Sequence, residues 1–86
     1  MIEEYRKEID KLDNLIVKLF LERNEISKKI SKEKKKYNKN ILDSSRENEI
    51  IDRFSKLYDE DIEYIKKLYK TIFEISKSIQ ENENEK

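Results

Sequence analysis

The chain has 86 residues, of which 35% are hydrophobic and 47% are charged, and its 20 basic side chains balance its 20 acidic side chains. The zero net charge argues against a general attraction to nucleic acid or membranes, and the absence of cysteine and histidine excludes disulfides and removes the commonest metal ligand and general base. One small domain with so little apolar surface is marginal as a monomer, so we expect a homo-oligomer, most simply a homodimer.

The sequence predicts an all-α fold in one domain. Glycine and proline are both absent, which rules out glycine-rich phosphate loops and disfavours tight β-hairpins. No apolar run is long enough to span a bilayer and the first residues show no signal-peptide pattern, so we expect a cytoplasmic protein. We expect a helical domain over residues 1–82 and a frayed tail over residues 83–86, because the final ENENEK has no apolar face.

The first predicted helix spans residues 2–36 and would be about 50 Å long, which is more than so short a chain can cover by itself. One face of it repeats every three or four residues, through Ile9, Leu12, Ile16, Leu19, Arg23, Ile26, Ile30 and Lys34. Arg23 interrupts this apolar stripe and Lys34 ends it. A buried and unpaired cation is costly, so we expect Arg23 to have an anionic partner, which is either a side chain or a ligand.

Two shorter helices are predicted after a loop over residues 37–43. The second helix begins near Ser44, where Ser44 and Glu47 have the spacing of a capping box. Three acidic residues at 59–61 favour the start of a third helix, since negative charge stabilises a helix N-terminus. The apolar row of this third helix continues into two polar residues, Ser76 and Gln80.

Each predicted helix thus interrupts its apolar face with hydrogen-bonding side chains, as a polar pocket inside a helical bundle requires. The chain has sixteen lysines but only four arginines, and arginine is the better residue where a planar fork must hold a carboxylate. Arg6, Arg23 and Arg46 are therefore candidates for anion binding. The interrupting residues are Arg23, Lys34, Arg46, Glu47, Ser76 and Gln80.

Every candidate also has a purely structural interpretation. Arg23 could form an ion pair with Glu22 or Glu47. Lys34 lies in a lysine-rich run that must be largely solvated, and Glu47 could act only as a helix cap. Ser76 and Gln80 could form hydrogen bonds between crossing helices or lie where the stripe meets water. Asp43, just before the second helix, could be its N-cap.

Taken together, the motifs resemble those of the all-α chorismate mutase family over residues 2 to about 80. The matching pieces are Arg6 with Ile9, Asp10 and Asp13; LER at residues 21–23; ISKEK at residues 30–34; DSSRE at residues 43–47; and Ser76 with Gln80. Family members often have a glycine before the motif lysine and a proline in the following loop, where this chain has Ser31 and the NKN of residues 38–40.

The resemblance implies an intertwined homodimer with three helices per chain, one long and two shorter. It also implies conversion of chorismate to prephenate, a step of phenylalanine and tyrosine biosynthesis that needs no nucleophile, metal or cofactor. By this resemblance Arg23 and the partner protomer's copy of Arg6 grip the two carboxylates of the substrate, and Ser76 supports a carboxylate. Lys34 reaches a carboxylate and the ether oxygen, and Gln80 donates a second hydrogen bond to that oxygen.

The same resemblance assigns the other end of the substrate to three residues. Glu47 accepts a hydrogen bond from the ring hydroxyl, and Asp43 and Arg46 shape that end of the site. Chorismate is a small dianion, and the expected partners are this substrate and a second copy of the chain.

Other functions stay open at this point. An isochorismate-pyruvate lyase on the same fold would use the same cations on a similar dianion. A non-catalytic helical dimerisation module or coiled coil should have a stripe that is apolar apart from one polar position, which fits the several interruptions poorly. A nucleic-acid binder using residues 28–36 is disfavoured by the zero net charge.

Overall fold

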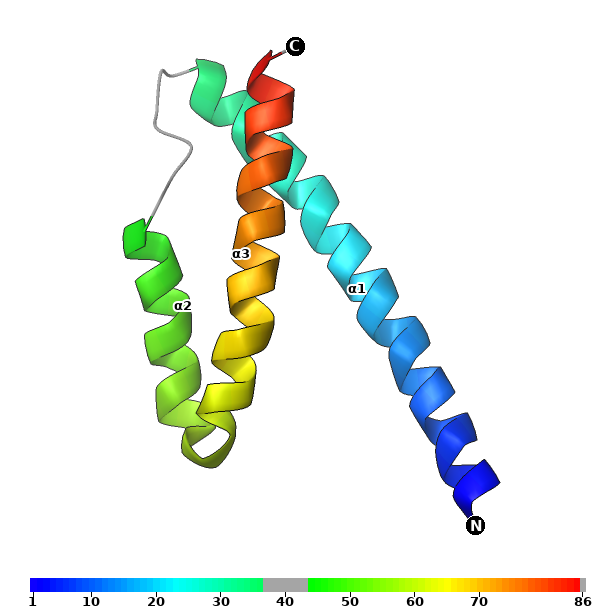
Figure 1. Cartoon of the computed structure of the whole chain (residues 1–86). Coiled ribbons are helices and arrows are strands. Elements are labelled where there is room, and N and C mark those ends of the chain that lie inside the picture. The colour runs from blue at the N-terminus through cyan, green and yellow to red at the C-terminus, as the bar shows by residue number, and fades with distance from the viewer. Residues whose placement is uncertain (37–43, 86) are drawn as a thin grey trace.

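The protein is seen in a computed structural model that describes the backbone of residues 1–36 and 44–85, and the side chains of residues 1–34 and 44–82. This part of the chain is entirely helical (Figure 1). The elements are α1 (Ile2–Lys36), α2 (Ser44–Leu57), the short 3₁₀ turn η1 (Asp59–Asp61) and α3 (Ile62–Glu85). The predicted first helix and the predicted start of the second are confirmed.

The corner between α2 and α3 differs in detail from the prediction. Residues 59–61 form a 3₁₀ turn ahead of α3, in which the Asp61 amide donates to the Tyr58 carbonyl oxygen at 3.1 Å. Tyr58 leaves the helical region with φ −137° and ψ 56°, so the chain turns without a glycine. The three acids still lie at the N-terminal end of α3, where they complement its dipole.

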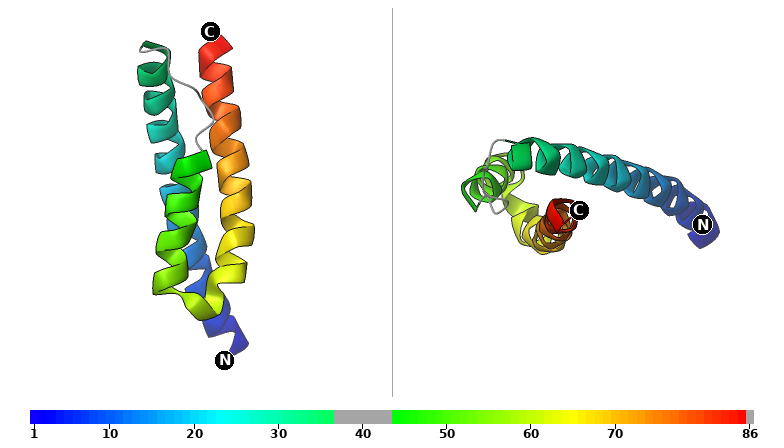
Figure 2. Two further views of the ribbon diagram at one scale, coloured as in Figure 1. Left: turned by 90° about the vertical axis from the view of Figure 1, so that its left-hand side faces the viewer. Right: turned by 90° about the horizontal axis from the view of Figure 1, so that it is seen from above.

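The helices make an open arrangement in which α2 and α3 form an antiparallel hairpin. α1 runs in the same direction as α3. Its C-terminal half lies beside the C-terminal half of α3, and its N-terminal half extends away from the hairpin (Figures 1 and 2). Residues 1–19 of α1 are all exposed. The long helix therefore has most of its surface uncovered within one chain.

The core of the single chain is small. Among the described residues, the only buried hydrophobic residue is Ile50 of α2, which is 7% exposed. Aromatic rings fill the hairpin, with the Phe54 ring centroid 5.1 Å from that of Tyr69 and the Tyr69 centroid 5.5 Å from that of Phe73. The Phe54–Tyr69 contact joins α2 to α3. The apolar stripe of α1 has no cover in this chain.

The C-terminal end of α3 is helical to Glu85 in the backbone, three residues beyond the predicted domain end at 82. The division into a domain over residues 1–82 and a frayed tail over 83–86 stays a prediction. No described helix combines the length and the apolar character needed to cross a membrane.

Candidate active site

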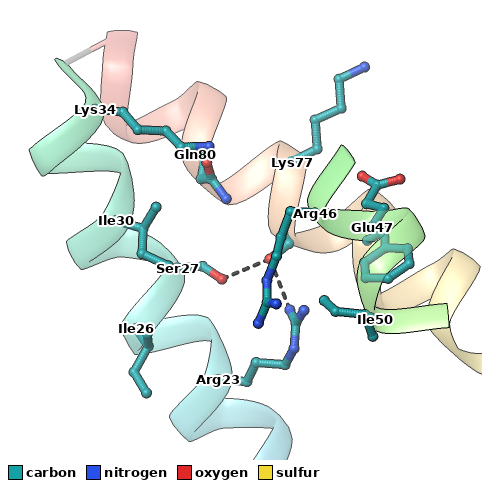
Figure 3. A pocket seen from close by; sticks show the side chains of 12 residues that line it. Arg23, Ile26, Ser27, Ile30, Lys34, Arg46, Glu47, Ile50, Lys77 and Gln80 are labelled. Carbon is teal, nitrogen blue, oxygen red and sulfur yellow. Dashed lines mark hydrogen bonds between the residues drawn. The ribbon is translucent and has the colours of Figure 1, made fainter. Parts of the chain in front are cut away.

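A pocket of about 370 Å³ lies where the C-terminal half of α1, the first turns of α2 and the C-terminal half of α3 meet. Six of the eight predicted site residues line it (Figure 3). They are Arg23, Lys34, Arg46, Glu47, Ser76 and Gln80. The separate motifs of the sequence are thus brought to one place by the fold.

Helical periodicity explains how these side chains converge. Arg23, Ser27 and Lys34 are spaced by four and seven residues, so they share one face of α1. Ser76 and Gln80 are one turn apart on α3 and face α1 across the gap. α2 contributes its first turns, with Glu47 half-buried at the opposite side of the pocket from Lys34 (Figure 3).

The contact between α1 and α3 at the pocket is polar. The Ser27 and Ser76 hydroxyl oxygens lie 2.7 Å apart, and the Ser31 hydroxyl donates to the backbone carbonyl oxygen of Gln80 at 2.9 Å. Ser31 is completely buried at 0% exposure. A small side chain at each of these positions lets the two helices approach closely enough for both bonds to form.

The contact that Arg23 makes bears most directly on what the pocket can bind. Its Nη1 donates to the Ser76 hydroxyl oxygen at 3.0 Å. No ion pair forms between this guanidinium and a carboxylate anywhere in the described residues, so the pairing with Glu22 or Glu47 considered from the sequence does not occur. A half-buried cation bonded only to a neutral hydroxyl keeps its positive charge available to an anion in the pocket.

Lys34 and Gln80 lie at the end of the pocket formed by the last turns of α1 and α3, and their side chains point toward one another (Figure 3). The Gln80 Oε1 atom is buried and has no hydrogen-bond partner among the described residues. A buried amide oxygen without a donor is costly, so this oxygen calls for a water molecule or a donor group of a ligand.

Arg46 is exposed and forms an ion pair with Glu49 one turn further along α2, at 3.2 Å between Nη1 and Oε2. Its side chain nevertheless lines the pocket, and its guanidinium points toward the same space as that of Arg23 (Figure 3). The lining holds four basic residues and one carboxylate, that of Glu47, so the lining is cationic in a chain of zero net charge. The basic residues are Arg23, Lys34, Arg46 and Lys77.

Two predicted site residues are not in this pocket. Arg6 is exposed near the N-terminus of α1, paired with Glu3 at 3.0 Å, and lies about 26 Å from Arg23 along the helix axis. It cannot reach the pocket of its own chain, and its expected origin in a partner protomer stays a prediction. Asp43 lies outside the described residues. Nowhere in the described residues are carboxylates grouped so as to hold a metal ion.

Sequence reasoning missed Ser27 and Ser31. Ser27 and Ser31 are four residues apart, as are Ser76 and Gln80, and this equal spacing was the feature of the sequence that could have indicated a contact between the two pairs. The apolar stripe drew attention to Ile26 and Ile30 instead, yet these side chains are 55% and 44% exposed and lie at the edge of the pocket. The face of α1 that meets α3 is the neighbouring serine row.

The buried Ser31 gives a stability prediction. Ser31→Leu should lower the free energy of unfolding by about 1–3 kcal/mol, because the larger side chain would push α1 away from α3 and break the bond to the Gln80 carbonyl. Thermal melts followed by circular dichroism measure this. Ser45→Leu, at an exposed position of α2, is the matched control and should change the melting midpoint little; equal losses in both variants would contradict the tight contact.

Among the described residues, three helices surround a pocket lined by basic residues and by a part-buried arginine–serine contact, as in a helical protein that binds a small molecule. Residues 5–81 match the family model for chorismate mutase type II. A chorismate mutase of Methanocaldococcus jannaschii is 37% identical over 84 residues, which cover 92% of this chain and 83% of that protein. No solved structure matches the chain. The chain belongs to the chorismate mutase type II family, whose enzymes are intramolecular isomerases.

Proposed function

We propose that the pocket between α1, α2 and α3 is the active site at which this chain converts chorismate to prephenate, in the biosynthesis of phenylalanine and tyrosine. The observation that carries the proposal is Arg23, a cation bonded to the neutral Ser76 hydroxyl in a pocket lined by three further basic residues. A small dianion would supply the negative charge that this pocket lacks. Family membership favours such an enzyme over a non-catalytic dimerisation module or a nucleic-acid binder.

The reaction is a [3,3] rearrangement within one molecule. As the ether C–O bond breaks, a C–C bond forms, and the electron pairs move around one six-membered ring of atoms. No group is transferred to the protein, so no nucleophile takes part. The enzyme accelerates such a step by holding the reactive conformer and by stabilising the negative charge that develops on the ether oxygen.

Arg23 and Ser76 hold one carboxylate of the substrate. The guanidinium offers a charged pair of donors, and the hydroxyl lies within hydrogen-bond distance of it. Lys34 and Gln80 donate to the ether oxygen from the α1–α3 end of the pocket. Because charge builds on that oxygen only as the bond breaks, these two donors act more strongly on the transition state than on the substrate.

Glu47 and Arg46 bind the hydroxyl end of the substrate from α2. The Glu47 carboxylate can accept a hydrogen bond from the ring hydroxyl, which would fix the orientation of the ring. Arg46 lines the same side of the pocket and balances the charge of Glu47. Asp43, just before α2, completes this end in our proposal by analogy with the family motif.

The active form in our proposal is an intertwined homodimer with two equivalent sites. The apolar stripe on α1 supports this, because Leu12, Ile16 and Leu19 are each 57–60% exposed in the single chain and would be covered by a second copy. Two-fold symmetry would also bring the partner's Arg6 to each pocket, where it would bind the second carboxylate. A cytoplasmic location stays a prediction from the sequence.

The pH dependence follows from the donor at the ether oxygen. Gln80 carries an amide that does not titrate, so kcat/KM should stay within a few-fold between about pH 5 and 9. Gln80→Glu should retain activity only in acid, since the carboxyl group must be protonated to donate. Steady-state rates across this range measure both, and a sharp acid optimum in the unmodified chain would contradict the role of Gln80.

Substrate choice separates the proposed function from its nearest rival. An isochorismate-pyruvate lyase would release pyruvate from isochorismate, whereas a mutase releases nothing. Purified protein assayed with each substrate separately should consume chorismate and form no pyruvate from either one. Faster pyruvate release from isochorismate than prephenate formation from chorismate would replace the proposal with the lyase.

A further inference from the structure

Ser27 lines the same pocket as Arg23 and Ser76. Its side chain is 4% exposed, and its hydroxyl oxygen is 2.7 Å from that of Ser76. Ser27 follows Arg23 by one helical turn, so both residues of α1 contact the same hydroxyl of α3. Figure 3 shows Arg23 and Ser27 on one face of α1, joined by the two dashed hydrogen bonds to Ser76.

The Ser76 hydroxyl has one proton and two lone pairs to share among its neighbours. One lone pair accepts the hydrogen bond from Arg23. The bond with Ser27 can run in either direction. If Ser76 donates to Ser27, its proton is used and it offers nothing to the pocket. If Ser27 donates to Ser76, both lone pairs of Ser76 are occupied and its proton is left for a third partner.

We propose that Ser27 is a positioning residue, whose hydroxyl donates to Ser76 and thereby directs the Ser76 proton to the substrate carboxylate that Arg23 binds. This inference rests on the proposed function, since it needs an anion in the pocket. An anion held by Arg23 favours this direction of the Ser27–Ser76 bond, because the Ser76 hydroxyl, which Arg23 contacts, then has its proton free for the bound carboxylate. The oxygen–oxygen distance of 2.7 Å is that of a well-formed O–H···O bond.

The effect of Ser27 should fall on binding and not on the chemical step. The carboxylate carries its charge in the substrate and in the transition state alike, so its contacts stabilise both equally. Loss of such a contact raises KM and leaves kcat unchanged. Ser27→Ala should therefore raise KM about fivefold, the size expected for one neutral hydrogen bond, with kcat within about twofold of the unmodified enzyme.

The test is a double-mutant cycle measured by steady-state kinetics on the full chain. Because Ser27 acts through Ser76, the double variant Ser27→Ala/Ser76→Ala should have the same KM as Ser76→Ala alone. Ser27→Thr keeps the hydroxyl and should restore a low KM. Alanine favours helix, so the alanine variants should stay folded, which circular dichroism checks. Ser78→Ala, at an exposed position of α3 outside the pocket, is the matched control and should change neither constant.

Several results would overturn the inference. If the fold-increase in KM of the double variant equals the product of the two single-variant increases, the two serines act independently and the inference fails. A fall in kcat at constant KM for Ser27→Ala would place its action on the chemical step. If Ser76→Ala raises KM and Ser27→Ala does not, the inference fails while the proposed site stands. If neither Arg23→Ala nor Ser76→Ala changes KM, the proposed site itself is wrong, and the role of Ser27 falls with it.

Discussion

Lys34→Ala should lower kcat by at least ~10²-fold, because it removes a charged donor that stabilises the ether oxygen in the transition state. This loss corresponds to about 2.7 kcal/mol of activation free energy. Lys34 lies at the end of the pocket where the buried Gln80 amide also points, so the substitution leaves the developing charge with one neutral donor. KM should change much less than kcat, since the lysine acts mainly as the bond breaks.

Lys32→Ala is the matched control for this experiment. Lys32 lies two residues earlier on α1, is exposed and does not line the pocket, so its removal should leave kcat within about twofold. Both variants should show the circular dichroism spectrum of the unmodified chain. Near-native turnover in a folded Lys34→Ala enzyme would refute the assignment of this pocket as the active site.

Two inactive variants should recover activity when they are mixed. Arg6→Ala and Lys34→Ala each damage both sites of a homodimer in which Arg6 comes from the partner protomer. A mixed dimer has one site with both substitutions and one site with neither. After unfolding and refolding a 1:1 mixture, half of the dimers are mixed, so about a quarter of the unmodified activity should return.

This prediction depends on how far Arg6 lies from the pocket of its own chain, which is about 26 Å along α1. If Arg6 instead served its own chain, every site of a mixed dimer would carry one substitution and no activity would return. The control is each variant refolded alone, which should stay inactive. A mass in solution equal to a single 10.6 kDa chain, with full activity, would also contradict the shared site.

The sequence was sufficient to predict the helices and the convergence of the site. Without glycine or proline, nothing in α1 stops a helix before residue 36, and the repeat of three and four residues sets which side chains share a face. Arg23 and Lys34 lie on the side of α1 next to the serine row that meets α3, and Gln80 lies on the facing side of α3, so the three side chains line one pocket.

The polar contact between α1 and α3 could not be predicted in the same way. A serine in a lysine-rich stretch is expected to be solvated, and no feature of the neighbouring sequence distinguishes the buried Ser31 from the exposed Ser45. Burial there depends on the close approach of α3, which is a tertiary property. The partner of Arg23 could not be predicted from the sequence either. Ser76 is 53 residues away, whereas the acidic residues Glu22 and Glu47 are closer in the sequence and were the candidate partners.

The most direct test of the account follows chorismate in the presence of purified protein. Loss of chorismate absorbance, with prephenate appearing in equal amount and no pyruvate, is the predicted result, and Arg23→Ala should strongly reduce it because it removes the cation that binds a substrate carboxylate. A folded protein that leaves chorismate unchanged, or an Arg23→Ala variant as active as the unmodified chain, would contradict the account.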